Sequence, residues 1–149
     1  MSTDTPLSPN NLYAACKASA YMTLSHLFCT YGVEFAWCRL FYLFGADEDE
    51  RRLIPYIRAR LEGGQNVELS SGVQVRDFLD VEVAAQMIVD TVLSDRQGPV
   101  NVCSGIPVTI RQVAEKIAES YGLVHLLQFD KRPDLESDPP FIVGLPTSD

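Results

Sequence analysis

The sequence predicts an α/β fold in which short strands alternate with amphipathic helices. Apolar, β-branched and aromatic residues form runs with few charges, which is typical of buried parallel strands. Between these runs, apolar residues recur at helical spacing, and glycine marks several of the helix ends. A chain of 149 residues suits one domain and can bury a hydrophobic core.

The first helix is expected to begin near Asn10 or Asn11 and to run to Tyr31. Asparagine is a favoured N-cap residue, and Gly32 suits a left-handed C-cap position. The apolar positions expected to face the sheet are Leu24, Leu27, Phe28 and Tyr31. A different side carries Ala15, Ser19, Met22, His26 and Cys29. Small residues on that side would allow another helix to approach closely.

A buried parallel strand is expected from Val33 to Phe41, because this run is rich in aromatic and β-branched residues. A second helix should run from about Asp49 to Glu62 and end at Gly63. The acidic cluster at 46–50 suits the positive end of the helix dipole. We interpret it as a solvated helix start.

The alternation of strands and helices continues along the rest of the chain. The further strands are expected at 67–69, 75–79, 100–103 and 124–129. Amphipathic helices are expected at 82–93 and 110–120. The segment from Lys131 onward contains four prolines and is predicted to be irregular.

Composition excludes several classes of partner. The net charge of -8 argues against binding to nucleic acid or to an anionic membrane surface. The four cysteines are dispersed and the chain has two histidines, so neither a metal site nor a disulfide framework is predicted. Apolar stretches fall short of the ~20 residues of a membrane span, and no signal peptide is recognisable. The expected location is the cytoplasm.

Tyr13 and Lys17 are the most informative pair in the chain. Four residues are about one helical turn, so the phenol and the ammonium project from the same helix face. A cation beside a phenol favours the phenolate, and such a tyrosine can exchange a proton with a substrate hydroxyl. The alternative is a surface helix pair without chemistry.

The motifs after this pair come in a fixed order. They are Arg-Leu-Phe-Tyr-Leu-Phe-Gly at 39–45, Leu-Ile-Pro at 53–55, Val-Arg-Asp-Phe at 75–78, Val-Asn-Val-Cys-Ser-Gly at 100–105 and a helix start at 109–115. This order closely resembles the extended short-chain dehydrogenase/reductase family, the NAD-dependent epimerases, dehydratases and ketoreductases of nucleotide sugars. The resemblance spans roughly Thr5 to Gly144.

The resemblance implies the C-terminal part of a Rossmann-type doubly wound parallel sheet plus a small mixed α/β substrate domain. The family's glycine-rich turn and upstream Ser or Thr do not occur in these 149 residues. We therefore expect the C-terminal half of an enzyme. Residues 1–45 would end the dinucleotide-binding domain and carry the tyrosine–lysine helix, and residues 46–149 would mainly form the substrate-binding region.

The resemblance also implies roles for individual residues toward NAD or NADP. Tyr13 corresponds to the general acid/base. Lys17 corresponds to the lysine that holds the nicotinamide ribose, and both residues would therefore contact the cofactor. Phe41 matches a position near the nicotinamide. No metal is implied.

Six further residues correspond to substrate contacts, namely Tyr42, Arg52, Leu53, Val67, Leu69 and Arg76. Arg76 matches the arginine that clasps the diphosphate, and a guanidinium suits phosphate oxygens because it can donate two parallel hydrogen bonds. The alternative for Arg76 is a surface ion pair with Asp77 or Asp80. Tyr42 replaces the family's asparagine, and Ala46 replaces its proline, so specificity at this segment departs from the family pattern.

The resemblance implies NAD(P)-dependent modification of a nucleotide sugar by an epimerase, dehydratase or ketoreductase, three activities that the sequence does not separate. The helix of Tyr13 and Lys17 would form a homodimer. The alternative is a truncated, non-catalytic fragment that at most binds a nucleotide sugar or dimerises.

Overall fold

The computed structural model describes residues 1–147 and has an α/β fold, as the sequence predicted. Its helices are α1 Leu12–Tyr31, α2 Leu53–Glu62, α3 Val81–Val92, α4 Ile110–Tyr121 and the 3-10 turn η1 Val124–Leu126. Its strands are β1 Ala36–Leu40, β2 Tyr42–Phe44, β3 Val67–Glu68, β4 Val75–Asp80, β5 Gly98–Val102, β6 Pro107–Thr109, β7 Leu127–Gln128 and β8 Phe141–Ile142.

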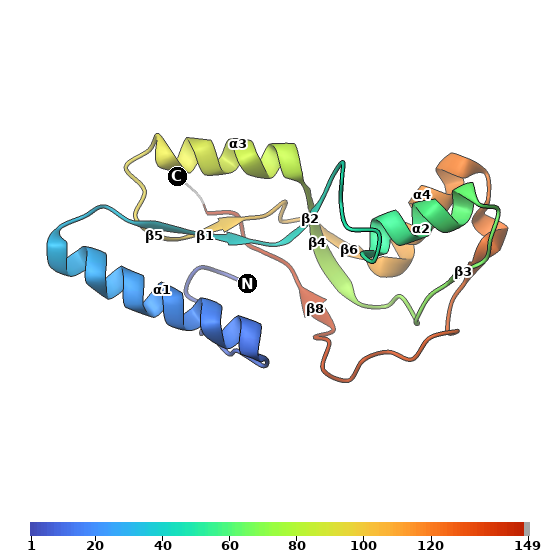
Figure 1. Ribbon diagram of the computed structural model, residues 1–149, viewed down its shortest axis with the longest axis horizontal. Helices are drawn as coiled ribbons and strands as arrows, with labels where there is room; N and C mark the ends of the chain where they lie inside the picture. The colour runs from blue at the N-terminus through green and yellow to red at the C-terminus, as the bar shows by residue number, and fades with distance from the viewer. Residues whose placement is uncertain (148–149) are drawn as a thin grey trace.

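Strands β1 and β5 pair in parallel, with Cys38 opposite Val100, and α1 and α3 lie on opposite faces of this pair (Figure 1). The first sheet therefore combines residues from both halves of the chain. Under α3, a small core forms around Leu79, Ala84 and Val102.

Helix α1 contacts the sheet through aromatic side chains. The ring of Tyr21 lies 5.5 Å from that of Trp37, and the ring of Phe28 lies 5.0 Å from that of Phe35. The expected contacts of Leu27 and Tyr31 were wrong, because these side chains are 44% and 74% exposed. The face that packs is set by Tyr21 and Phe28, which are seven residues apart and so lie on one side of the helix.

The chain changes sheets at Phe41, where the expected strand ends, and a second strand that was not predicted follows. Strand β1 ends at Leu40, and β2 begins at Tyr42 and pairs in parallel with β4. Strand β4 also pairs with β6 in antiparallel and with β8 in parallel orientation. Residues 33–35 are not in the strand, because the amide of Val33 closes the end of α1 on the carbonyl of Phe28.

The remaining elements form a unit around α2 and α4, on the side of β4 away from α1 (Figure 1). Its core contains Ile57, Leu61, Val67, Leu69, Ala114 and Ala118. Only Leu127 and Gln128 of the expected strand at 124–129 pair with another strand, namely β3. Residues 124–126 form η1 instead, because the left-handed Gly122 turns the chain back at the end of α4.

Helix ends agree closely with local capping chemistry. The Asn11 side chain accepts a hydrogen bond from the Ala14 amide, and Gly32 has φ 65°. Thr109 and Gln112 form a capping box at the start of α4. Helix α2 is the exception, because it begins at Leu53 and not at Asp49. The preceding acidic residues form a turn in which Asp47 has φ 57°.

Asp77, at the centre of β4, is fully buried and joins three segments of the chain. Its Oδ1 accepts from the amide and the hydroxyl of Ser104, at 2.8 and 2.7 Å. Its Oδ2 accepts from the amides of Gly105 and Gly144, at 2.9 and 3.1 Å. One carboxylate thus fixes the loop after β5 and the segment after β8 to β4.

We expect Asp77→Asn to lower the free energy of unfolding by about 2–4 kcal/mol, because an amide nitrogen would face buried N–H donors that lose their acceptor. Urea unfolding followed by circular dichroism measures this change. Asp80→Asn is the matched control, because Asp80 caps α3 through the Glu82 amide and asparagine caps equally well. Equal unfolding midpoints for the two variants would contradict the role of Asp77.

Candidate functional site

A cavity of about 320 Å³ lies between the start of α2, the start of β2, β4 and the C-terminal segment. Four of the six predicted substrate residues line it, namely Tyr42, Arg52, Leu53 and Arg76. We call it the arginine cavity. Its other lining residues are Glu48, Ile54, Ser70, Gln74, Phe78, Ile110 and Asp138.

Arg76 is held in place by contacts along its guanidinium. Its side chain is 3% exposed, and Nη2 donates to Oδ1 of Asp138 at 2.6 Å. Nη1 donates to the carbonyl of Val75 at 2.8 Å, and the guanidinium carbon lies 5.4 Å from the centre of the Tyr42 ring. The expected alternative partners were wrong, because Asp77 binds backbone amides and Asp80 caps α3.

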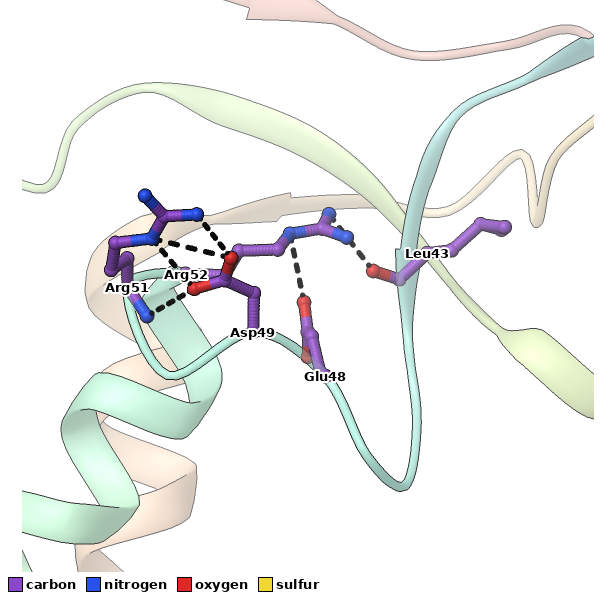
Figure 2. Close-up of polar contacts among 5 residues, drawn as sticks. All are labelled: Leu43, Glu48, Asp49, Arg51 and Arg52. Carbon is purple, nitrogen blue, oxygen red and sulfur yellow. Dashed lines mark hydrogen bonds and ion pairs between the residues drawn. The ribbon is translucent and has the colours of Figure 1, made fainter.

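Arg52 spans the gap between the loop before α2 and strand β2 (Figure 2). Its Nε lies 3.0 Å from Oε1 of Glu48, and its Nη2 donates to the carbonyl of Leu43 at 3.2 Å. The backbone of β2 and the carboxylate of Glu48 therefore direct the guanidinium across the wall of the cavity.

The acidic cluster before α2 serves two purposes. Asp49 is exposed and pairs with Arg51 (Figure 2), whose hydrogen bonds lower the pKa of the Asp49 carboxyl to about 2. Glu48 is different, because its side chain is 10% exposed and belongs to the cavity wall. The interpretation of the whole cluster as a solvated helix start was therefore wrong for Glu48.

The charges of the cavity wall balance formally, since two arginines face two carboxylates. Each guanidinium carries five N–H donors. The hydrogen bonds and ion pairs described above engage two nitrogens of Arg52 and two of Arg76. Both arginines therefore keep N–H donors that can bind an oxyanion.

Val67 and Leu69 do not join this cavity. Both side chains are buried in the core between α2 and α4. Phe41 also lies outside the cavity, at the change of sheets. A Cβ atom on Gly144 would lie 2.9 Å from the end of the Phe41 ring, so the ring packs closely against the segment after β8.

Tyr13 and Lys17 lie in the first two turns of α1, at the end of the helix that points toward β8 in Figure 1. The Lys17 Nζ is 5.9 Å from the centre of the Tyr13 ring, which confirms the expected side-by-side geometry. Tyr13 is 73% exposed. Lys17 lines a separate depression of about 260 Å³ together with Tyr21, Trp37 and Arg39. The structure thus keeps the pair apart from the arginine cavity.

Sequence reasoning missed Glu48, Gln74 and Asp138 as cavity residues. Glu48 had a detectable signal, since it precedes Arg52 by four residues. Asp138 and Gln74 had none, because the Arg76–Asp138 contact spans 62 positions of the chain. Within residues 1–147, no group of three or more His, Cys, Asp or Glu side chains is placed to hold a metal ion. In the same range, no helix is long and apolar enough to cross a membrane.

Comparison with known proteins identifies the family. The model of the NAD dependent epimerase/dehydratase family matches residues 1–103. The chain belongs to this family. This membership confirms the resemblance that the order of motifs indicated.

Curated proteins that are similar in sequence are distant relatives of this chain. The chain is 26% identical over 122 residues to a dTDP-6-deoxy-L-talose 4-dehydrogenase (NAD(+)) of Aggregatibacter actinomycetemcomitans, an alignment of 80% of this chain and 45% of the relative. The three curated relatives found are covered over 36–45% of their length, so the chain spans less than half of each.

Solved structures of epimerase/dehydratase enzymes share the fold. A dTDP-glucose 4,6-dehydratase of Bacillus anthracis, in complex with NAD, matches 98% of this chain and 47% of its own, with a TM-score of 0.88 and 24% identity. A UDP-glucose 4-epimerase of Thermus thermophilus, in complex with NAD, matches 93% of this chain and 47% of its own, with a TM-score of 0.82 and 25% identity. The Rossmann-type α/β class predicted from the sequence is confirmed.

Proposed function

We propose that this chain supplies the tyrosine–lysine pair and the substrate-binding region of an enzyme that modifies a nucleotide sugar with NAD or NADP. One observation carries the proposal. The buried Arg76 and the neighbouring Arg52 line one cavity and keep free N–H donors, which suit the oxygens of a diphosphate. Apolar side chains in the same wall, such as Phe78 and Ile54, suit the remaining surface of a nucleotide.

Tyr13 and Lys17 would provide the chemistry. Their common helix face lets the phenol exchange a proton with a sugar hydroxyl while the ammonium holds a ribose hydroxyl. Both side chains are exposed, so they fit a cofactor that covers this end of α1. The nicotinamide supplies hydride transfer when it is bound. Phe41 is proposed to lie on the same side of the protein as the cofactor, and Val67 and Leu69 to support the substrate region from its core.

In the proposed organisation, residues 1–45 belong to the dinucleotide-binding domain, and residues 46–149 mainly form the substrate-binding region. A homodimer through α1 is part of the proposal, because its outer face is unpacked at Ser19, Met22, His26 and Cys29. The four cysteines are unpaired, which suits a reducing compartment such as the cytoplasm.

In this proposal Tyr13 and Lys17 would serve epimerisation, dehydration or ketoreduction alike, so they do not separate the three activities. A second candidate function is binding without catalysis, as a non-catalytic fragment that holds a nucleotide sugar or dimerises. The arginine cavity alone would serve it, because the lining of this cavity includes neither Tyr13 nor Lys17. Both candidates use the arginine cavity for the diphosphate.

Asp138→Asn tests the diphosphate role of this cavity. Asp138 competes for Arg76 and would repel a phosphate group, so its neutralisation should tighten binding of a nucleoside diphosphate by about three- to tenfold. Isothermal titration with UDP, dTDP and GDP measures the change. Glu136→Gln is the control, because it removes one charge from the same segment at an exposed position. Weaker or unchanged binding in Asp138→Asn would argue against a diphosphate at Arg76.

A further inference from the structure

Two buried acceptor atoms in the wall of the arginine cavity have no hydrogen-bond partner. They are Oε2 of Glu48 and Oε1 of Gln74, each with less than 1 Å² of exposed surface. Within residues 1–147, they are the buried side-chain nitrogen or oxygen atoms that lack a partner, and both residues line this one cavity. Buried polar atoms are nearly always paired, so two unpaired acceptors at one site call for a functional explanation.

The orientation of the Gln74 amide is fixed by its neighbour. Gln74 Nε2 donates to Oδ1 of Asp134 at 2.7 Å. Hydrogen bonds from Ser71 and from Gln74 lower the pKa of the Asp134 carboxyl, so Asp134 remains an acceptor at neutral pH. The amide nitrogen must therefore face Asp134, which leaves the carbonyl oxygen of Gln74 as an acceptor without a donor.

Glu48 is fixed in a comparable way. Its Oε1 pairs with Nε of Arg52, and the side chain is 10% exposed. Oε2 of the same carboxylate receives no hydrogen bond. An ionised carboxylate only accepts hydrogen bonds, so the missing partner must be a donor.

A ligand that pairs with all free polar groups of the cavity wall needs two kinds of polar group. The free N–H groups of Arg52 and Arg76 suit phosphate oxygens, whereas Glu48 and Gln74 need an N–H or O–H donor. A nucleotide sugar carries both, because its base or its sugar hydroxyls can donate. Both acceptor atoms are sealed from solvent, so a small rotation of each side chain must accompany the contact.

We infer that Glu48 and Gln74 are specificity-determining residues that accept hydrogen bonds from a donor group of the bound nucleotide sugar. The inference rests on the proposed function and adds to it the ligand group that the site would select, namely a hydrogen-bond donor. Each acceptor atom has less than 1 Å² of exposed surface, so a ligand without the donor would leave both acceptors unpaired. Such a ligand should bind at least about tenfold more weakly.

Isothermal titration of UDP, dTDP and GDP, and of their ring-N-methylated counterparts, tests the base as the source of the donor. UDP-glucose, dTDP-glucose and GDP-mannose, compared with the nucleoside diphosphates, test the sugar hydroxyls. For the wild type, we expect the dissociation constants of the two ligands in one of these comparisons to differ by about tenfold or more. In Glu48→Gln and in Gln74→Met, the ratio of these two dissociation constants should fall toward one. The glutamine would turn its oxygen to Arg52 and its NH₂ to the cavity, and methionine keeps the length of Gln74 without an acceptor.

Matched controls are Glu50→Gln and Gln86→Met, which make the same chemical changes at exposed positions outside the cavity and should keep the wild-type ratios. The inference is overturned by the following result: nucleoside diphosphates bind and Arg76→Ala weakens this binding, but the ratio of dissociation constants in each of the two comparisons is the same in the wild type and in the variants of Glu48 and Gln74. Absence of binding by every probe overturns the proposed function and the inference together. Thermal melting of each variant identifies any loss of fold.

Discussion

Tyr13→Phe is expected to remove most of the turnover of an enzyme in which this chain is joined to a glycine-rich dinucleotide-binding half. The hydroxyl is the only group lost, and its proton acts in the transition state. General acid–base catalysis contributes about 10²- to 10⁴-fold, so kcat should fall by that factor while KM changes little. The exposed position of Tyr13 leaves the fold unaffected by the change.

Steady-state kinetics with the joined enzyme measure this effect. Tyr31→Phe is the matched control, because Tyr31 is equally exposed on the same helix and carries no assigned role. Lys17→Ala should also weaken dinucleotide binding, since the ammonium is proposed to hold the ribose. If Tyr13→Phe kept full activity, the assignment of the acid/base would be wrong, and the pair would be a surface feature of α1.

Arg76→Ala is expected to raise the dissociation constant of a nucleoside diphosphate about ten- to a hundredfold. A hydrogen bond to a charged group contributes roughly 1.5–3 kcal/mol, and the guanidinium can place two such bonds on phosphate oxygens. Lysine should recover part of the affinity, because it supplies the charge without the planar fork. The effect should lie in binding and not in the chemical step.

Titration of wild type, Arg76→Ala and Arg76→Lys measures this loss. Arg51→Ala is the control, because Arg51 is an exposed arginine near the same loop and pairs with Asp49 outside the cavity. Circular dichroism must show that the alanine variant folds, since it leaves Asp138 without its partner. Unchanged affinity in a folded Arg76→Ala would assign Arg76 to a structural role, as the clamp of the C-terminal segment.

The elements that could be predicted from the sequence are those decided by local interactions. Asn11, Gly32 and the Thr109–Gln112 box cap their helices through contacts within a few residues, and these helix ends were predicted closely. The Tyr13–Lys17 geometry is local in the same sense. The helical register alone brings such residues together.

The elements that could not be predicted depend on distant partners. The strand expected from Val33 to Phe41 contains β1, which pairs with β5, but the second strand β2 after Phe41 was not predicted, because its pairing with β4 sets it. Likewise, the alternative considered for Arg76 was an ion pair with the neighbouring Asp77 or Asp80, whereas its partner in the structure is Asp138. Leu69 is in the core because α2 and α4 cover it.

The proposed function depends on the arginine cavity as the diphosphate site. A crystal structure of the chain with a nucleotide sugar, chosen as the tightest ligand by titration, tests it most directly. We expect the diphosphate oxygens within hydrogen-bond distance of the Arg76 guanidinium, with the Asp138 contact displaced or shared. A diphosphate bound elsewhere, with Arg76 and Asp138 still paired as in the free protein, would contradict the claim.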